Sequence, residues 1–151
     1  MPPGDVTQGT QEQELTSPSG HRDEQGAKEA VMRDHRSLVL WAADCAERVL
    51  PYFEEKYPKD GRPRKAVEAA RAWARGEIAL SEVRAAAFAA HAAARAAAAH
   101  AAACGAARAA GHAAATAHVA AHGVQAATYA GHSATDSLVQ QRGGDVLEAA
   151  K

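Results

Sequence analysis

The sequence predicts an all-α protein, a compact antiparallel bundle of about four to five helices with disordered tails. Alanine accounts for 42 of the 151 residues, whereas Leu, Ile, Val and Phe together supply only 20. Strands favour large β-branched and aromatic residues, so this composition argues against a β-sandwich or a doubly wound sheet. Small side chains suit helices whose backbones pack close together. The net charge of −1 argues against a wholly disordered chain, which usually combines few large apolar residues with a high net charge.

The length fits one domain, and a polar segment flanks it on each side. Residues 1–27 are rich in Gly, Pro, Gln, Ser and acidic side chains, with only two large apolar residues besides the initiator methionine. Such a segment cannot bury enough surface to offset the entropy cost of ordering, so it predicts a disordered N-terminal tail. Residues 135–151, which contain a Gly-Gly pair, predict a flexible C-terminal tail. The helical domain is therefore expected over residues 28–134.

A first helix is predicted over residues 28–49. Its apolar stripe recurs at steps of three and four residues, which brings side chains to one face of an α-helix. The stripe consists of Leu38, Trp41, Cys45 and Val49. Pro51 then kinks or restarts the chain, because proline removes a helical hydrogen bond. One or two further helical turns are expected before Pro58.

A second helix is predicted over residues 62–75. Pro63 fits its first turn, where a missing N–H costs nothing. Gly76 suits the position just after the last turn, where many helices end on a left-handed residue. The preceding tripeptide Lys59-Asp-Gly61 is typical of a turn, so the two helices are expected to reverse direction there.

Residues 83–135 form a block without an acidic side chain, and it holds 29 of the 42 alanines and six of the eight histidines. Its charged residues are Arg84, Arg95 and Arg108. Ser81 is placed to cap the helix that enters the block. An uninterrupted helix from residue 82 to residue 131 would be about 75 Å long, which is too long for a compact domain of this size. We therefore predict a reversal near residues 100–105 that gives two antiparallel helices.

Polar side chains in this block predict a candidate binding site. Four of them fall on one helical stripe, in line with Gly111: His118, His122, Gln125 and Tyr129. Another face is shared on the preceding helix by Arg84, Phe88, His91 and Arg95. The two faces meet if the helices are antiparallel. The candidate binding residues are His91, His112, His118, His122 and Tyr129.

Three interpretations of these histidines remain open. His118 and His122 are four residues apart, a spacing that can hold a metal ion on one helical turn. The block lacks carboxylate ligands and an HEXXH motif, so we expect no metal and no cofactor. We favour polar residues that hydrogen-bond to each other and to the backbone at helix contacts. The third interpretation is a surface for a ligand or a partner.

Other function classes are disfavoured by the same sequence. The N-terminus lacks the basic and apolar regions of a secretory signal, and no stretch of about 18 residues is apolar enough to cross a membrane. Cys45 and Cys104 form no CxxC motif, which fits a reducing cytoplasm. The balanced charge gives no electrostatic footprint for nucleic acid. His100 lies four residues before Cys104, but the surroundings favour a structural thiol, so no catalytic residue is assigned.

Three segments carry a resemblance to a known family. They are LWAADCAERVLPYFEEKYP over residues 40–58, DGRPRKAVEAARAWARGE over residues 60–77 and AAGHAAATAHVAAH over residues 109–122. Together they resemble the immunity-protein-five-like group, a family of small helical bacterial immunity proteins, over about residues 35–131. The resemblance implies an all-helical cytoplasmic domain that binds a cognate toxin protein, blocks it and catalyses no reaction.

The resemblance assigns no site residues. Two alternative functions therefore remain beside the antidote: a His-lined helical domain that binds a metal or a small ligand, and a helical oligomerisation module whose alanine faces pack between subunits. The oligomeric state is not predicted by the sequence.

Overall fold

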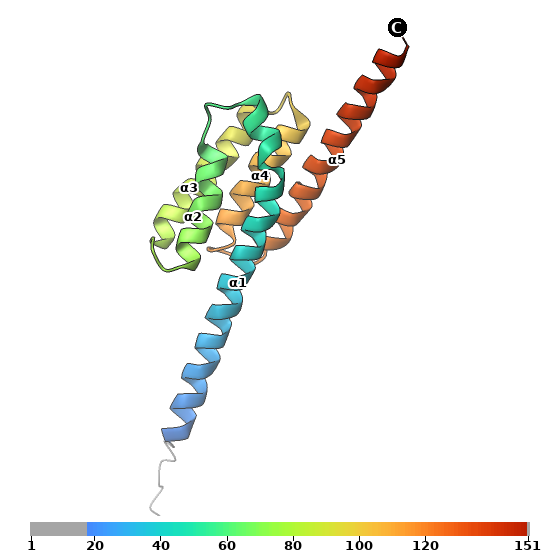
Figure 1. Cartoon of the computed structure of the whole chain (residues 1–151). Helices are drawn as coiled ribbons and strands as arrows, with labels where there is room; N and C mark the ends of the chain where they lie inside the picture. The colour runs from blue at the N-terminus through green and yellow to red at the C-terminus, as the bar shows by residue number, and fades with distance from the viewer. Residues whose placement is uncertain (1–17, 151) are drawn as a thin grey trace, which may run out of the picture.

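The computed structural model describes residues 18–150, with side chains from residue 22 onward, and over that range it consists of five α-helices and no strand (Figure 1). The helices are α1 (Pro18–Lys56), α2 (Arg62–Ala74), α3 (Leu80–Ala96), α4 (Ala101–Ala115) and α5 (His122–Ala149). They pack against one another as a bundle. The predicted all-α class and the predicted number of helices are confirmed.

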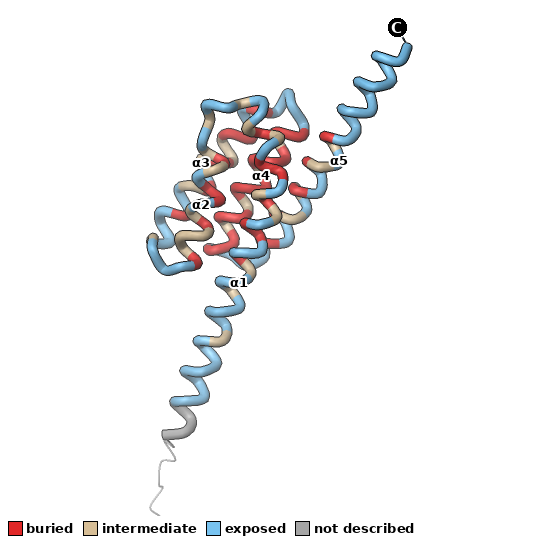
Figure 2. Tube along the Cα trace, in the orientation of Figure 1, coloured by how far each residue is buried: buried red, intermediate tan, exposed pale blue. Residues whose placement is uncertain are grey.

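Helix α4 is the centre of the bundle, because it contacts each of the other four described helices. Ten of its fifteen residues are buried, and all ten are alanine or glycine. A helix with neighbours on every side leaves little room beyond its Cβ atoms, so alanine is the side chain that fits this position. The alanines of α4 are thus covered by helices of the same chain (Figure 2).

The large apolar side chains surround this alanine core. The largest that are fully buried are Phe53, Leu50, Val39, Val67 and Val83. The predicted stripe of the first helix is only partly buried: Val49 is in the core, whereas Trp41 is 47% exposed. The buried face of α1 also contains alanines. The predicted stripe misses them, because it is defined by the large residues alone.

Helix α2 has the predicted bounds to within one residue. Pro63 is buried in its first turn, and Gly76 follows its last turn with a φ of +76°. The N–H of Gly76 donates to the carbonyl of Trp73 at 2.9 Å, as in a left-handed helix end. Pro51 does not end the first helix, since α1 continues through it to Lys56.

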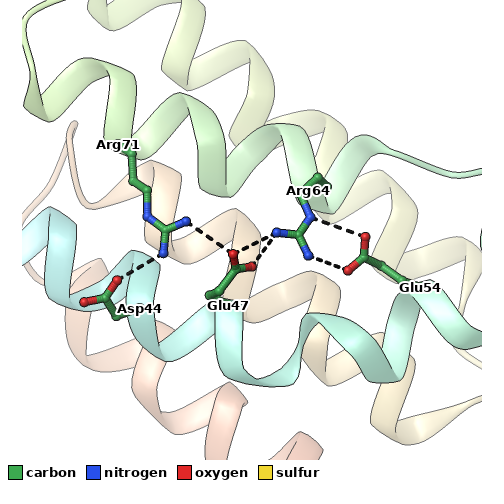
Figure 3. Close-up of polar contacts among 5 residues, drawn as sticks. All are labelled: Asp44, Glu47, Glu54, Arg64 and Arg71. Carbon is green, nitrogen blue, oxygen red and sulfur yellow. Dashed lines mark hydrogen bonds and ion pairs between the residues drawn. The ribbon is translucent and has the colours of Figure 1, made fainter.

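Charged side chains join α1 to α2 (Figure 3). Arg64 donates to Glu47 at 2.6 Å and to Glu54 at 2.5 Å. Arg71 donates to Asp44 at 3.0 Å and reaches Glu47 at 3.4 Å. The hydrogen bond to Glu54 is the largest cause that raises the pKa of Arg64 above its usual value. This network fixes the position of α2 along α1.

The alanine block reverses direction twice, whereas one reversal is predicted. The first reversal, residues 97–100, ends at the residue where the predicted range of 100–105 begins. His100 adopts an extended backbone there, with φ −120° and ψ 95°, and the chain returns as α4. The predicted cap is wrong, because Ala79 and not Ser81 occupies the N-cap position of α3.

The second reversal, residues 116–121, divides the predicted second helix of the block into α4 and α5. Thr116 is fully buried there, and its hydroxyl donates to the carbonyl of His112 at 2.8 Å. The prediction of two helices in this block is therefore wrong. The reason is local: the reversal contains no glycine or proline and three of its six residues are alanine, so the sequence gives no signal that the helix ends there.

Helices α1 and α5 extend beyond the bundle at opposite ends of it (Figures 1 and 2). The side chains of residues 22–29 and 138–150 are exposed. The sequence predicts tails over 1–27 and 135–151, but the structure is helical from residue 18 and up to residue 149. A helix satisfies its backbone hydrogen bonds locally and needs no buried surface for that. The flexibility of both ends stays a prediction, and the remainder of the N-terminal segment lies outside the described residues.

Candidate functional site

Three histidines from three helices meet in one cluster. His91 lies within α3, His112 lies near the end of α4, and His122 is the first residue of α5. The ring of His91 meets that of His112 edge-on, with the centroids 4.7 Å apart. The rings of His112 and His122 are stacked, with 5.1 Å between centroids, and their Nδ1 atoms lie 2.9 Å apart. We call these three residues the histidine cluster.

Tyr129 of α5 packs against the histidine cluster. Its ring stacks on the ring of His112 at 5.2 Å and is tilted by only 6°. The guanidinium of Arg108, one turn before His112 on α4, lies 6.0 Å from the centre of the Tyr129 ring. His112 is therefore in ring contact with three neighbours, which fixes its orientation.

Gly111 explains how the ring of His91 comes so close to α4. A Cβ at this position would lie 2.7 Å from Cε1 and 2.8 Å from Nε2 of His91. Real Cβ atoms do not make such contacts, so glycine is required for this ring position. Gly111 thus makes room for His91 of α3, which is not one of the residues that the sequence aligns with it; that predicted alignment is wrong, because Gly111 lies in α4 whereas His122 and Tyr129 lie in α5.

The charge state of the cluster follows from its surroundings. Burial is the main cause that lowers the pKa of His112, to about 4, and the neighbouring His91, His122 and Arg108 lower it further. Burial also lowers the pKa of His91, with a smaller effect from Arg108. Since residues 83–135 contain no acid, no carboxylate within this block opposes these effects. His91 and His112 are therefore neutral near pH 7.

A pocket of about 270 Å³ opens beside the cluster. Its lining consists of Arg84, Ala87, Phe88, His91, Ala115, His118 and His122. Phe88 is 64% exposed, and the guanidinium of Arg84 lies 5.9 Å from the centre of its ring. The pocket therefore combines an apolar lining with one cation and imidazole edges. We call it the α3 pocket.

The structure brings together four of the five candidate residues, His91, His112, His122 and Tyr129. His118 is the exception, because it lies in the reversal before α5 and is exposed at the α3 pocket. The predicted single stripe is therefore wrong for His118. Arg108 is absent from the predicted set, although its position four residues before His112 places it on the same helical face.

Metal binding is not supported by this arrangement. Among the described residues, no group of three or more His, Cys, Asp or Glu side chains is arranged to hold a metal ion. The rings pack on one another, and the Nδ1 atoms of His112 and His122 are separated by a hydrogen-bond distance.

A larger, open depression of about 570 Å³ lies at the turn between α1 and α2. Its lining contains three cations, Lys59, Arg62 and Lys65. Arg62 is paired with Asp60 at 2.7 Å, and this contact is the main cause that lowers the pKa of Asp60. The depression is more open to solvent than the α3 pocket, so it would enclose less of a bound group. We therefore place the candidate site at the histidine cluster and the α3 pocket.

Comparison with known families identifies the kind of protein. The model of the Imm-5 like putative immunity protein family matches residues 29–145. The chain belongs to this family. Neither a curated protein nor a solved structure matches the chain.

The family match runs from the N-terminal part of α1 to near the end of α5. It therefore includes the whole bundle, the histidine cluster and the α3 pocket of this immunity-family chain. The resemblance seen in residues 40–58, 60–77 and 109–122 is confirmed. Over the described residues, no helix combines the length and apolar character that a membrane span requires.

Proposed function

We propose that this immunity-family protein is an antidote that binds a cognate bacterial toxin protein in the cytoplasm and blocks it without catalysing a reaction. The observation that carries the proposal is the family match over residues 29–145. The bundle supports it, because closely packed helices hold a surface in one shape before a partner arrives. A preformed surface loses little entropy on binding.

The chemistry of the candidate site favours binding over catalysis. A catalytic imidazole usually has an acid that orients it, and the block of residues 83–135 has none. Cys104 is only half-buried, but the ring of His100 packs edge-on against Tyr57 at 5.9 Å. His100 is therefore packed against Tyr57, which directly follows α1, and is not arranged as a base for that thiol.

The two alternative functions have less support. The α3 pocket, at about 270 Å³, is smaller than the roughly 300–1,000 Å³ that is typical of small-molecule sites. The alanine faces of α4 are covered within one chain, so they do not call for a second subunit. Both observations favour a protein partner that is not another copy of this chain.

A titration with the toxin encoded beside this gene tests the proposal. The purified full-length protein is added to a fixed amount of active toxin, and the remaining toxin activity is measured. An antidote that acts by binding removes activity linearly and completely at about one equivalent, and a one-to-one complex appears in light scattering. Cells that express the toxin survive when they also express this protein.

Two results would contradict the proposal. Complete loss of toxin activity at about a hundredth of an equivalent would show turnover and therefore catalysis. Full toxin activity in the presence of an excess of folded protein would exclude the antidote function for that toxin, and the same result with the toxins beside related genes would end the proposal.

A further inference from the structure

The α3 pocket has the features of a docking point for an acidic protein surface. We propose that an apolar side chain of the partner enters the α3 pocket, while carboxylates beside it pair with Arg84 and with the neighbouring arginines of the acid-free block. This inference rests on the proposed antidote function and specifies which surface of the protein meets the toxin.

The size of the pocket indicates an inserted side chain. A volume of about 270 Å³ has room for one large apolar side chain of a partner and lies below the usual range for free ligands. Ala87 and Ala115 leave the space open, because their side chains end at Cβ. Binding hot spots are typically pockets of this kind, filled by one anchor residue and surrounded by polar contacts.

Phe88 marks the rim of this docking surface. Its side chain is 64% exposed, although α3 buries other residues, among them Val83, Ala87 and Ala90. It therefore contributes little to the core and is available to a partner. Aromatic side chains are enriched at protein interfaces, because they offer a large contact area at a low entropy cost.

The arginines of this region differ from the four that lie in α2 or directly after it. Arg62, Arg64, Arg71 and Arg75 each pair with a carboxylate of the same chain. In contrast, Arg84 and Arg108 contact aromatic rings, and neither they nor Arg95 form an ion pair with any described residue. Glu82 lies two residues before Arg84, but no acid lies within ten residues of Arg95 or Arg108. Three cations that pair with no described carboxylate favour a partner that supplies the carboxylates.

The histidine cluster also contributes to this docking surface. His91 and His122 form one wall of the α3 pocket, and contacts with His112 hold both rings in place. Both imidazoles add hydrogen-bonding atoms to this wall, and burial lowers the pKa of His91 so that its ring adds no charge near pH 7. The pocket is thus preorganised for one apolar group with acidic neighbours.

Four full-length variants test the inference in the toxin titration. Phe88→Asp and Arg84→Glu change the docking surface. Val146→Asp and Arg48→Glu are the matched controls, since both residues are exposed on other helices. Phe88→Asp and Arg84→Glu each weaken toxin binding by about 30-fold or more, whereas both controls stay within about threefold of the unchanged protein. Thermal melting verifies that all four variants are folded.

The outcomes separate this inference from the proposed function. Equal neutralisation by all folded variants overturns the α3 pocket as the docking point and leaves the antidote function intact. If the unchanged protein neutralises no toxin, peptide binding to the α3 pocket is tested separately. A library of displayed random peptides is selected for binding to the purified full-length protein. Enrichment of peptides with Asp or Glu beside a large apolar residue, lost with Phe88→Asp, supports the inference, and the absence of such enrichment overturns it.

Discussion

Nδ1 of His112 lies 2.9 Å from Nδ1 of His122, so one ring donates a hydrogen bond and the other accepts it. Two protonated rings would place N–H against N–H, and the contact therefore holds a single proton. Burial together with neighbouring positive charge lowers the pKa of His112 to about 4. The folded protein thus keeps His112 neutral at pH values where a free imidazole is already charged.

We expect the free energy of unfolding to fall as the pH is lowered from about 6.5 to about 4. In this window the unfolded chain binds a proton on His112, whereas the folded chain does not. Because the side chain is only half-buried, screening reduces the effect to about 1 kcal/mol. Urea unfolding of the unchanged protein and of His112→Gln at several pH values measures it. If both proteins lose stability equally as the pH falls, His112 is not the cause of the pH dependence.

Gly111→Ala is expected to lower the free energy of unfolding by about 1–3 kcal/mol, because the new Cβ would overlap the ring of His91. Gly131→Ala is the matched control: this glycine also lies within a helix, but nothing is within 4 Å of its Cβ position. The control should raise the free energy of unfolding by about 0.5–1 kcal/mol through helix propensity. Denaturant unfolding measures whether each variant is less or more stable than the unchanged protein. A more stable Gly111→Ala variant would contradict the prediction, because it would show that the ring of His91 does not need this space.

Gly105→Ala is expected to destabilise the contact between α4 and α5. Its Cβ would lie 3.3 Å from the Cα of Ser133, and a backbone atom cannot rotate away. Ser133 also donates from Oγ to the carbonyl of Ala102 at 2.6 Å, so Ser133→Ala should cost about 1 kcal/mol. Thermal melting of the two single variants and the double variant measures both effects. A cost in the double variant below the sum is expected, since both changes affect one contact.

Arg64→Met is expected to lower the free energy of unfolding by about 1 kcal/mol, since one guanidinium holds Glu47 and Glu54. The three side chains are 33%, 35% and 39% exposed, which places the effect at the upper end for surface ion pairs. Arg75→Met is the control, because its pair with Glu77 is more exposed. The difference between Arg64→Met and the unchanged protein should shrink toward about 1 M salt. A salt-independent difference would point to lost packing instead.

The sequence predicts the fold class and the second helix well, because these depend on strong local signals. Pro63 and Gly76 mark the ends of α2, and both take the backbone positions that their chemistry favours. The reversal at 116–121 could not be predicted, because alanine is compatible with a helix as well as with this turn. The extended ends of α1 and α5 were expected as tails, since composition reports on burial and not on local helix formation.

The candidate site was predicted for a partly wrong reason. His91, His112, His122 and Tyr129 do meet, but the sequence places His118 and His122 on one long helix. Three separate helices bring the cluster together, and His118 lies in the reversal between two of them. Ring stacking and the one-proton contact depend on tertiary packing, which spacing along one helix does not describe.

The alanine-filled centre of the bundle also affects how the protein responds to temperature. The buried positions of α4 are alanine and glycine, and such residues expose less apolar surface on unfolding than leucine or phenylalanine would. The heat-capacity change of unfolding is therefore expected below the usual value of about 12–15 cal/mol/K per residue. A smaller heat-capacity change flattens the curve of stability against temperature, so the bundle loses less stability on cooling than a leucine-rich domain of the same length.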